Sequence, residues 1–476
     1  MPENSNPAWC YSKGGLHFSY SLGQFRLKTD GFRDNNDLEQ NILNAFGQFQ
    51  LSYKTSLQAE IRSTDNEKGD LGMLFDPENF MPALRKDEEV DSLRFGFRHG
   101  FSNRSDLIGS VIYQDADFAT KNLGPNFSID SDLESYKFEI QHLYRARHWH
   151  NTSGATYEAN DTGVVTTFTV PIPVPPFLAE SIVVEHFDTD QASFYTYANF
   201  NYLEGIIVTV GGSAIFLDGQ TVDKHQFNPK IGLTWELTGG MSLRTAVFRT
   251  LQGPLISKQN IQPSLEPTQV AGFNQSFFGV EGEDTWNYGI ALDQKFLQSF
   301  YVGGEVSRRD RMVPFLNFSA FPSIVDEADV EENLARAYLY WTPNSQLALS
   351  AEYQYERLDN DGQTFGEGAT KIRTQRLPLE FSYFNESGFS AELSATYVKQ
   401  KGDFIDSTSP GFLAPGEDDF WVFDAVVGYR LPKRYGVIGL QINNLFDKNF
   451  QFQDIDPENS RISPERLILL KITLAY

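Results

Sequence analysis

The sequence predicts an all-β protein in which a transmembrane antiparallel sheet forms an up-and-down β-barrel. Three observations predict this class: apolar and polar residues alternate in many segments, short and long connections alternate between those segments, and the last segment has the form of a membrane-barrel strand. Such barrels combine strands of this kind with short periplasmic turns and long extracellular loops. We expect about 20 strands, with 18 or 22 as alternatives.

The C-terminal segment shows the alternation most clearly. Its apolar residues share one parity, and hence one face of an extended strand: Ile468, Leu470, Ile472, Leu474 and Tyr476. Lys471 and Thr473 fall on the other face. The pattern resembles the C-terminal strand of bacterial outer-membrane proteins, which ends on Phe or Tyr. We interpret these five residues as an assembly strand.

Further segments repeat the two-residue period of the C-terminal strand. They include residues 47–53, 93–98, 231–237, 286–295, 347–356, 389–397 and 421–431. Soluble β-sandwiches alternate in the same way, so alternation alone does not distinguish the two classes.

The connections between the expected strands favour the barrel, because short and long connections alternate along the chain. Short turns are expected near residues 54, 102–104, 203–205, 238–240, 297–299, 342–344, 385–388 and 432–434. Long polar connections are expected near 254–283, 314–328, 359–370, 403–418 and 448–464. If the chain ends at the periplasmic side, every short turn must also be periplasmic. This alternation of short and long connections continues to the N-terminus only if one strand lies within 147–167. The strand number is then even, and the N-terminus lies on the periplasmic side. We therefore expect an N-terminal periplasmic stub at 1–15 and the barrel at 16–476.

Composition excludes other classes. No run approaches the ~18 apolar residues of a membrane helix, and the formal net charge of −24 argues against a nucleic-acid partner. The single cysteine, Cys10, excludes an intrachain disulfide. Residues 1–11 lack the basic, apolar and cleavage regions of a signal peptide. Because a barrel must be exported, we expect a mature or truncated form whose N-terminal part is missing.

Two resemblances add to this interpretation. Residues 439–450 (GLQINNLFDKNF) resemble the penultimate strand of TonB-dependent receptors, and residues 420–429 look like the strand before it. The resemblance implies an outer-membrane transport barrel, although the about fifteen residues before the first expected strand leave no room for that family's plug domain. The resemblance therefore does not imply that this chain performs energised uptake of siderophores or cobalamin, as that family does. More weakly, residues 248–254 and 262–274 resemble barrels fused behind tetratricopeptide repeats, which implies polysaccharide or polymer export.

Charged residues on the polar parity are candidates to line the lumen. They are Arg94, Arg98, Glu139, Arg145, Arg244, Glu305, Arg309, Glu352, Glu380, Glu392, Asp424 and Arg430. Water and opposite charges can solvate them there, whereas Arg or Lys at the lipid midplane costs ~2–4 kcal/mol. These residues could set solute preference, or they could form cross-strand pairs that stabilise the wall. The 254–283 loop could narrow the conduit, or it could cover the outer rim.

The sequence thus predicts a passive or partner-gated transport conduit in the bacterial outer membrane. The alternatives are a polymer-export barrel and a soluble acidic all-β binding protein. No G-x-S-x-G motif indicates an enzyme. His148 and His150 could form a metal pair but lack a third ligand at firm spacing, so we expect no metal and no cofactor. Expected partners are outer-membrane lipid and lipopolysaccharide, the barrel-assembly machinery, and a periplasmic partner or a lost N-terminal domain.

Overall fold

The computed structural model describes most of the chain, and all structural statements concern these residues. They are 8–14, 17–124, 127–171, 178–220, 222–237, 239–254, 264–275, 279–317, 324–360, 369–405, 413–454 and 462–474.

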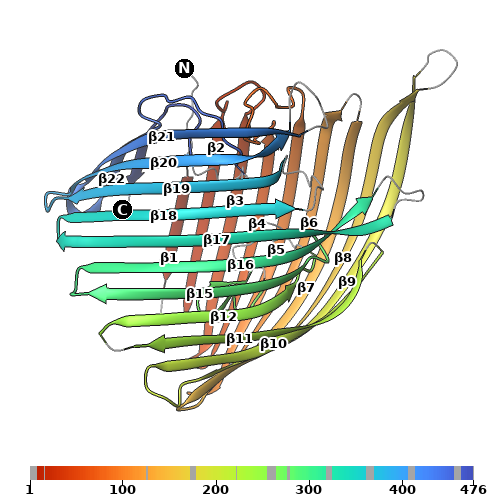
Figure 1. The fold of residues 1–476 in the computed structure, drawn as a ribbon. Coiled ribbons are helices and arrows are strands. Elements are labelled where there is room, and N and C mark those ends of the chain that lie inside the picture. Colours follow the sequence, from red (N-terminus) through yellow and green to blue (C-terminus); the bar gives the residue numbers. More distant parts are fainter. Residues whose placement is uncertain are drawn as a thin grey trace.

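One antiparallel sheet of 21 strands contains almost all the regular structure (Figure 1). Its first part is β1 (Ala8–Gly14), β2 (Phe18–Thr29), β3 (Leu38–Ser52), β4 (Thr55–Lys68), β5 (Arg85–Ser102), β6 (Ser105–Gly124), β7 (Phe127–Arg145), β8 (Trp149–Pro171), β9 (Leu178–Phe200), β10 (Ile206–Gly219), β11 (Asp223–Glu236) and β12 (Met241–Leu251). Its second part is β15 (Asp284–Phe296), β16 (Phe300–Asn317), β17 (Ile324–Asn344), β18 (Leu347–Asn360), β19 (Ala369–Phe384), β20 (Phe389–Ile405), β21 (Leu413–Arg430), β22 (Gly436–Asn443) and β23 (Leu467–Leu474). A separate hairpin joins β13 (Gln269–Val270) to β14 (Phe273–Asn274), and a 3₁₀ turn, η1 (Pro432–Arg434), follows β21.

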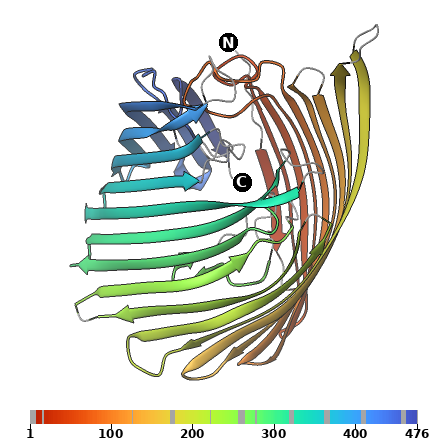
Figure 2. The same cartoon turned by 45° about the vertical axis from the view of Figure 1, so that its right-hand side comes forward.

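Each strand of the sheet pairs with its neighbour in sequence, from β1–β2 to β22–β23, with β12 pairing directly with β15. The sheet curves so that β1–β9 face the C-terminal strands across an interior that contains loops (Figure 2). Within the described residues no ladder joins β1 to β23. Closure of the barrel by pairing of the first and last strands therefore stays a prediction.

The strand count differs from the expectation at the N-terminus. Ala8–Gly14 lies in the segment assigned to a stub, yet it pairs with β2 and belongs to the sheet. With 21 strands, an odd number, the first and last strands run in the same direction. β1 therefore begins at the end of the sheet that carries the long connections. This corrects the expectation that the chain starts at the periplasmic end. This strand was missed because it is only seven residues long and alternates weakly. In contrast, β8 (Trp149–Pro171) supplies the strand that loop parity required within 147–167.

Several strands extend further than their apolar pattern predicted. β16 continues to Asn317 and β17 begins at Ile324, so most of the expected 314–328 loop belongs to a hairpin. The ladder continues without interruption through Phe315–Asp326 and Leu316–Val325 to Asn317–Ile324. Backbone hydrogen bonds do not require apolar side chains, so the acidic Asp326 and Glu327 do not end the strand.

The sheet is apolar outside and polar inside. In β7 the outward Phe138 and Ile140 are 48% and 46% exposed, while the alternating Lys137, Glu139 and Gln141 are buried. In β23 the assembly-strand residues Ile468, Leu470, Ile472 and Leu474 are 58–67% exposed. Tyr476 lies outside the described residues. An exposed apolar surface this extensive is unfavourable in water and marks a membrane or protein contact.

No helix in the described part of the chain is both long and apolar enough to span a membrane.

Candidate transport interior

The long β12–β15 connection (residues 252–283) folds against the inner wall. Val270 and Phe273, at the β13–β14 hairpin, are buried with Tyr195, Phe248 and other wall residues. Two wall glycines make room for this hairpin: a Cβ on Gly289 would lie 2.4 Å from a Phe273 ring carbon, and one on Gly232 would lie 2.8 Å from the Ala271 Cβ. The described part of the loop is therefore packed inside, as the infolding hypothesis predicted.

The hairpin reaches far along the strands. The Gly272 carbonyl accepts a hydrogen bond of 3.3 Å from Arg244 Nη1. Arg244 precedes Leu251, the last residue of β12, by seven positions. At about 3.3 Å per residue, the loop descends roughly 20 Å from the strand end before meeting this side chain.

Glu139 attaches Ser264 and Leu265 of this connection to the wall. It accepts hydrogen bonds from the Leu265 backbone N–H (2.8 Å), the Ser264 hydroxyl (3.0 Å) and the Tyr195 hydroxyl (3.0 Å). Three donors satisfy a buried carboxylate well, because charge-assisted hydrogen bonds are the strong ones. The predicted lumen residue Glu139 thus holds the loop.

A second attachment contains a buried ion pair. Lys230 of β11 is 2% exposed, and its Nζ lies 3.5 Å from Glu266 Oε1. The same ammonium group donates to Gln275 Oε1, and the Tyr197 hydroxyl donates to Glu266. Because water does not reach the Lys230 ammonium group, Glu266 and Gln275 of the loop must satisfy its charge and its hydrogen bonds.

The β4–β5 connection (residues 69–84) crosses to the C-terminal strands. The Phe75 ring stacks on Phe404 of β20 with centroids 4.0 Å apart, and the Phe75 N–H donates to Gln453 Oε1 at 3.0 Å. The Asp454 N–H donates to the Met73 carbonyl at 2.9 Å. The loop and the β22–β23 connection together form a polar and aromatic bridge at the end of the barrel that carries the long loops.

A cavity of about 640 Å³ lies between these infolded loops and the wall. Its lining includes Phe273, Glu283, Arg311, Glu332 and Gln453. The volume falls within the range of small-molecule sites, roughly 300–1,000 Å³.

The charges at this cavity are mostly compensated. Arg311 donates to both carboxylate oxygens of Glu283, at 2.7 and 2.8 Å, and also pairs with Glu332. Arg376 pairs with Glu356 at 2.5 Å. The lining therefore offers dipoles and neutralised charge pairs, a surface suited to a polar solute.

The twelve predicted lumen residues all lie on the parity opposite to the exposed apolar residues, and several form pairs. Arg98 and Arg145 both contact Asp106, at 2.7 and 2.5 Å. Arg244 contacts Asp293 at 3.1 Å and Glu305 at 3.4 Å.

The remaining members of this set are spread along the wall. Arg309 pairs with Glu332, and Glu352 lies 2.7 Å from Arg336. Glu380 accepts from Ser382, and Asp424 accepts from the Asn444 N–H. The structure leaves Arg94 and Glu392 half-buried and Arg430 exposed. Cross-strand pairing thus accounts for several of these charges, and their role in selecting a solute stays a prediction.

Sequence reasoning missed Lys230, Glu266 and Asp106. The polar parity of β11 could have indicated Lys230, because Lys230 precedes the outward Ile231. Glu266 lies in an irregular loop and carries no periodic signal. His148, one of the two histidines considered as a metal pair, stacks on Tyr202 with ring centroids 5.5 Å apart.

A family profile described as "TonB dependent receptor-like, beta-barrel" matches residues 12–304, more than half of the chain. The chain belongs to this family. A comparison with curated proteins finds no match.

Receptors and transporters are among the solved structures of similar fold. The copper transporter OprC has a TM-score of 0.73 at 11% identity, covering 100% of this chain and 79% of OprC. The pyoverdine receptor FpvA from Pseudomonas aeruginosa PAO1, bound to pyoverdine, has a TM-score of 0.71 at 11% identity, with 100% and 77% covered. The complex of FpvAI with pyocin S2 has a TM-score of 0.70 at 13% identity, with 94% and 68% covered.

These findings confirm the expected family, the all-β barrel class and the transport-barrel interpretation. They do not favour the soluble binding protein or the polymer exporter. The structural relatives are receptors and transporters, not enzymes, and the family is one of outer-membrane proteins.

Proposed function

We propose that this barrel is a passive or partner-gated outer-membrane conduit, narrowed by the infolded β12–β15 connection. The observation that carries the proposal is the attachment of this connection to the inner wall through Glu139 and Lys230. A polar interior behind an apolar outer surface provides a path for water-soluble molecules, and the loop restricts it.

The lining supports a small polar solute. Paired arginines and glutamates at the 640 Å³ cavity can exchange their partners for groups of a solute. Structural relatives bind pyoverdine or transport copper, as their names state, and their low identity carries only the fold to this chain. A periplasmic partner, or a domain on a longer form of the protein, would supply gating.

The remaining partners follow from the membrane location. The exposed apolar side chains of the strands would contact outer-membrane lipid. Polar extensions of the hairpins, such as Arg308–Asp310, would contact lipopolysaccharide. The C-terminal strand would be recognised by the barrel-assembly machinery. The formal net charge of −24 would repel the phosphates of a nucleic acid, so we propose no nucleic-acid partner.

Single-channel conductance in planar bilayers tests the constriction. Replacing residues 264–275 by a Gly-Ser linker should raise the conductance, because the hairpin then no longer occupies the interior. The paired variants Glu139→Gln with Glu266→Gln should raise it partly, and Gln269→Ala, which alters an exposed hairpin side chain, serves as the matched control. Heat-modifiable gel migration verifies that each barrel is folded. Equal conductance in folded wild-type and linker proteins would contradict the proposal.

A further inference from the structure

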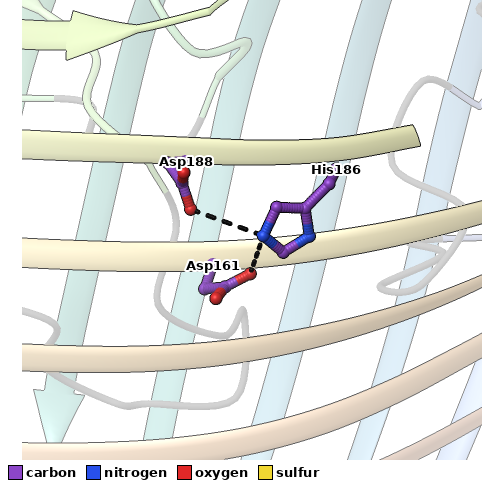
Figure 3. A group of neighbouring side chains, drawn as sticks. All are labelled: Asp161, His186 and Asp188. Atoms are coloured by element: carbon purple, nitrogen blue, oxygen red, sulfur yellow. Dashed lines mark ion pairs between the residues drawn. The ribbon is translucent and has the colours of Figure 1, made fainter.

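Two groups of histidine and aspartate lie on the outward face of neighbouring hairpins. In the first, His186 Nε2 lies 3.1 Å from Asp161 Oδ1 and 3.7 Å from Asp188 Oδ1 (Figure 3). Strands β8 and β9 supply these three side chains.

The second group repeats the arrangement on β10 and β11. His225 Nε2 lies 3.1 Å from Asp218 Oδ1 and 3.9 Å from Asp223 Oδ1. In both groups one nitrogen and two carboxylate oxygens lie within 4.8 Å of one another. The side chains are 56–76% exposed, so solution ions can reach them.

The spacing suits a shared cation. Zn²⁺ binds imidazole nitrogen and carboxylate oxygen at about 2.0–2.2 Å, so two such ligands in a tetrahedral site lie about 3.4 Å apart. The separations of 3.1 and 3.7 Å in one group, and of 3.1 and 3.9 Å in the other, bracket this value. Small side-chain rotations would equalise the distances.

The strand register gives an independent reason to expect a cation. Asp161 is the direct cross-strand partner of Asp188, and Asp218 is the direct partner of both Asp190 and Asp223. Like charges directly opposite each other destabilise a sheet. Within the described residues no Lys or Arg forms an ion pair with any of these five aspartates, so no lysine or arginine offsets their charge.

The groups lie next to the exposed aromatic surface. Asp190 accepts a 2.7 Å hydrogen bond from the outward Tyr157, and the His225 ring contacts outward Phe216 with centroids 5.4 Å apart. These aromatic residues are 41–47% exposed. The acidic residues therefore follow the apolar band toward the long-loop end, on the outer surface.

We propose that each group binds one divalent transition-metal cation of the Zn²⁺ type. One imidazole nitrogen and two carboxylate oxygens hold the ion, and water completes the coordination. Imidazole suits Zn²⁺, Cu²⁺ and Ni²⁺, whereas sites for Mg²⁺ and Ca²⁺ consist of oxygen ligands. The bound ions offset the charges of the opposed pairs Asp161–Asp188 and Asp218–Asp223, and they tie β8 to β9 and β10 to β11. The sites are outside the barrel and independent of conduction.

Titration calorimetry of the folded, detergent-solubilised chain without a polyhistidine tag tests the sites, with ZnCl₂ as the probe. We expect about two Zn²⁺ per chain, falling to about one in either His186→Ala or His225→Ala and to none in the double variant. Asp161→Asn should weaken one site at least tenfold. Mg²⁺ at the same concentration should not compete.

His17→Ala is the matched control, because His17 is exposed and lies outside both groups. It should retain both ions. Heat-modifiable migration checks the fold of each variant, which these exposed substitutions should preserve. Absence of Zn²⁺ binding by the wild-type chain, or unchanged stoichiometry in the double histidine variant, would overturn the proposal.

Discussion

Removal of the Lys230 charge should release the interior hairpin. Lys230 and Glu266 are 2% and 7% exposed, so Lys230→Met leaves the carboxylate buried without its cation. Breaking one partner of a buried pair costs about 3–5 kcal/mol. The hairpin can leave the wall without unfolding the sheet, so the cost should shift the docking equilibrium by roughly two to three and a half orders of magnitude.

Amide hydrogen exchange over residues 264–275 measures this shift. Exchange in Lys230→Met should accelerate by about 10²-fold or more wherever the wild-type hairpin opens locally. The double variant Lys230→Met with Glu266→Leu removes both charges and should recover most of the protection, because no unpaired ion remains. Equal protection in the wild-type and single-variant proteins, or a double variant less protected than the single, would refute the reasoning.

Three further predictions concern the loop, the lipid face and the long-loop end. Gly289→Ala should displace Phe273 and cost about 1–3 kcal/mol of hairpin docking, measured as faster exchange in the loop. Leu470→Arg should destabilise the folded barrel by about 2–4 kcal/mol in vesicles, measured by urea titration of heat-modifiable migration. The Arg85 side chain, by hydrogen bonding, lowers the pKa of Asp37 in the β2–β3 loop. A lowered pKa in the folded state means that ionised Asp37 stabilises the folded loop. This stabilisation is fully present above the unfolded-state pKa of about 3.9 and is lost as the pH falls through the lower pKa of folded Asp37, so protection of the loop amides should decline in acid.

Each of these predictions has a matched comparison. Gly304→Ala places a Cβ no closer than 3.7 Å to its nearest neighbour and should leave the hairpin docked. Thr473→Arg lies on the opposite parity of β23 from Leu470 and should be tolerated better. Arg85→Ala should make loop exchange less dependent on acid. An effect of Gly304→Ala as large as that of Gly289→Ala, equal losses at 470 and 473, or unchanged acid sensitivity would contradict the respective argument.

The strands could be predicted because each one repeats a local period. In β7 and β23, alternate apolar residues such as Phe138, Ile140 and Leu470 indicate one outward face, and the structure exposes them there. Loop parity even required β8 before its pattern was clear. β1 could not be found in this way, because AWCYSKG offers only a short and mixed alternation.

The interior contacts depend on information that no local pattern contains. Glu266 meets Lys230 only because an irregular loop folds inward, and wall glycines such as Gly289 make room for that loop. The opposed Asp161 and Asp188 become neighbours only once the β8–β9 register is known. The sequence alone therefore indicates the wall, while these sites depend on loop geometry and register.

The bridge formed by Phe75 has a consequence for the order of assembly. Its hydrogen bond to Gln453 joins positions 378 residues apart in the chain. Contacts between such distant segments need the intervening chain to be arranged first. The loop after β4 is synthesised early, yet it acquires its final neighbours only when the last hairpin arrives. A chain that lacks that hairpin would keep the Phe75 ring stacked on Phe404 but would lose the hydrogen bond from the Phe75 N–H to Gln453, so protection of this amide would report whether assembly has finished.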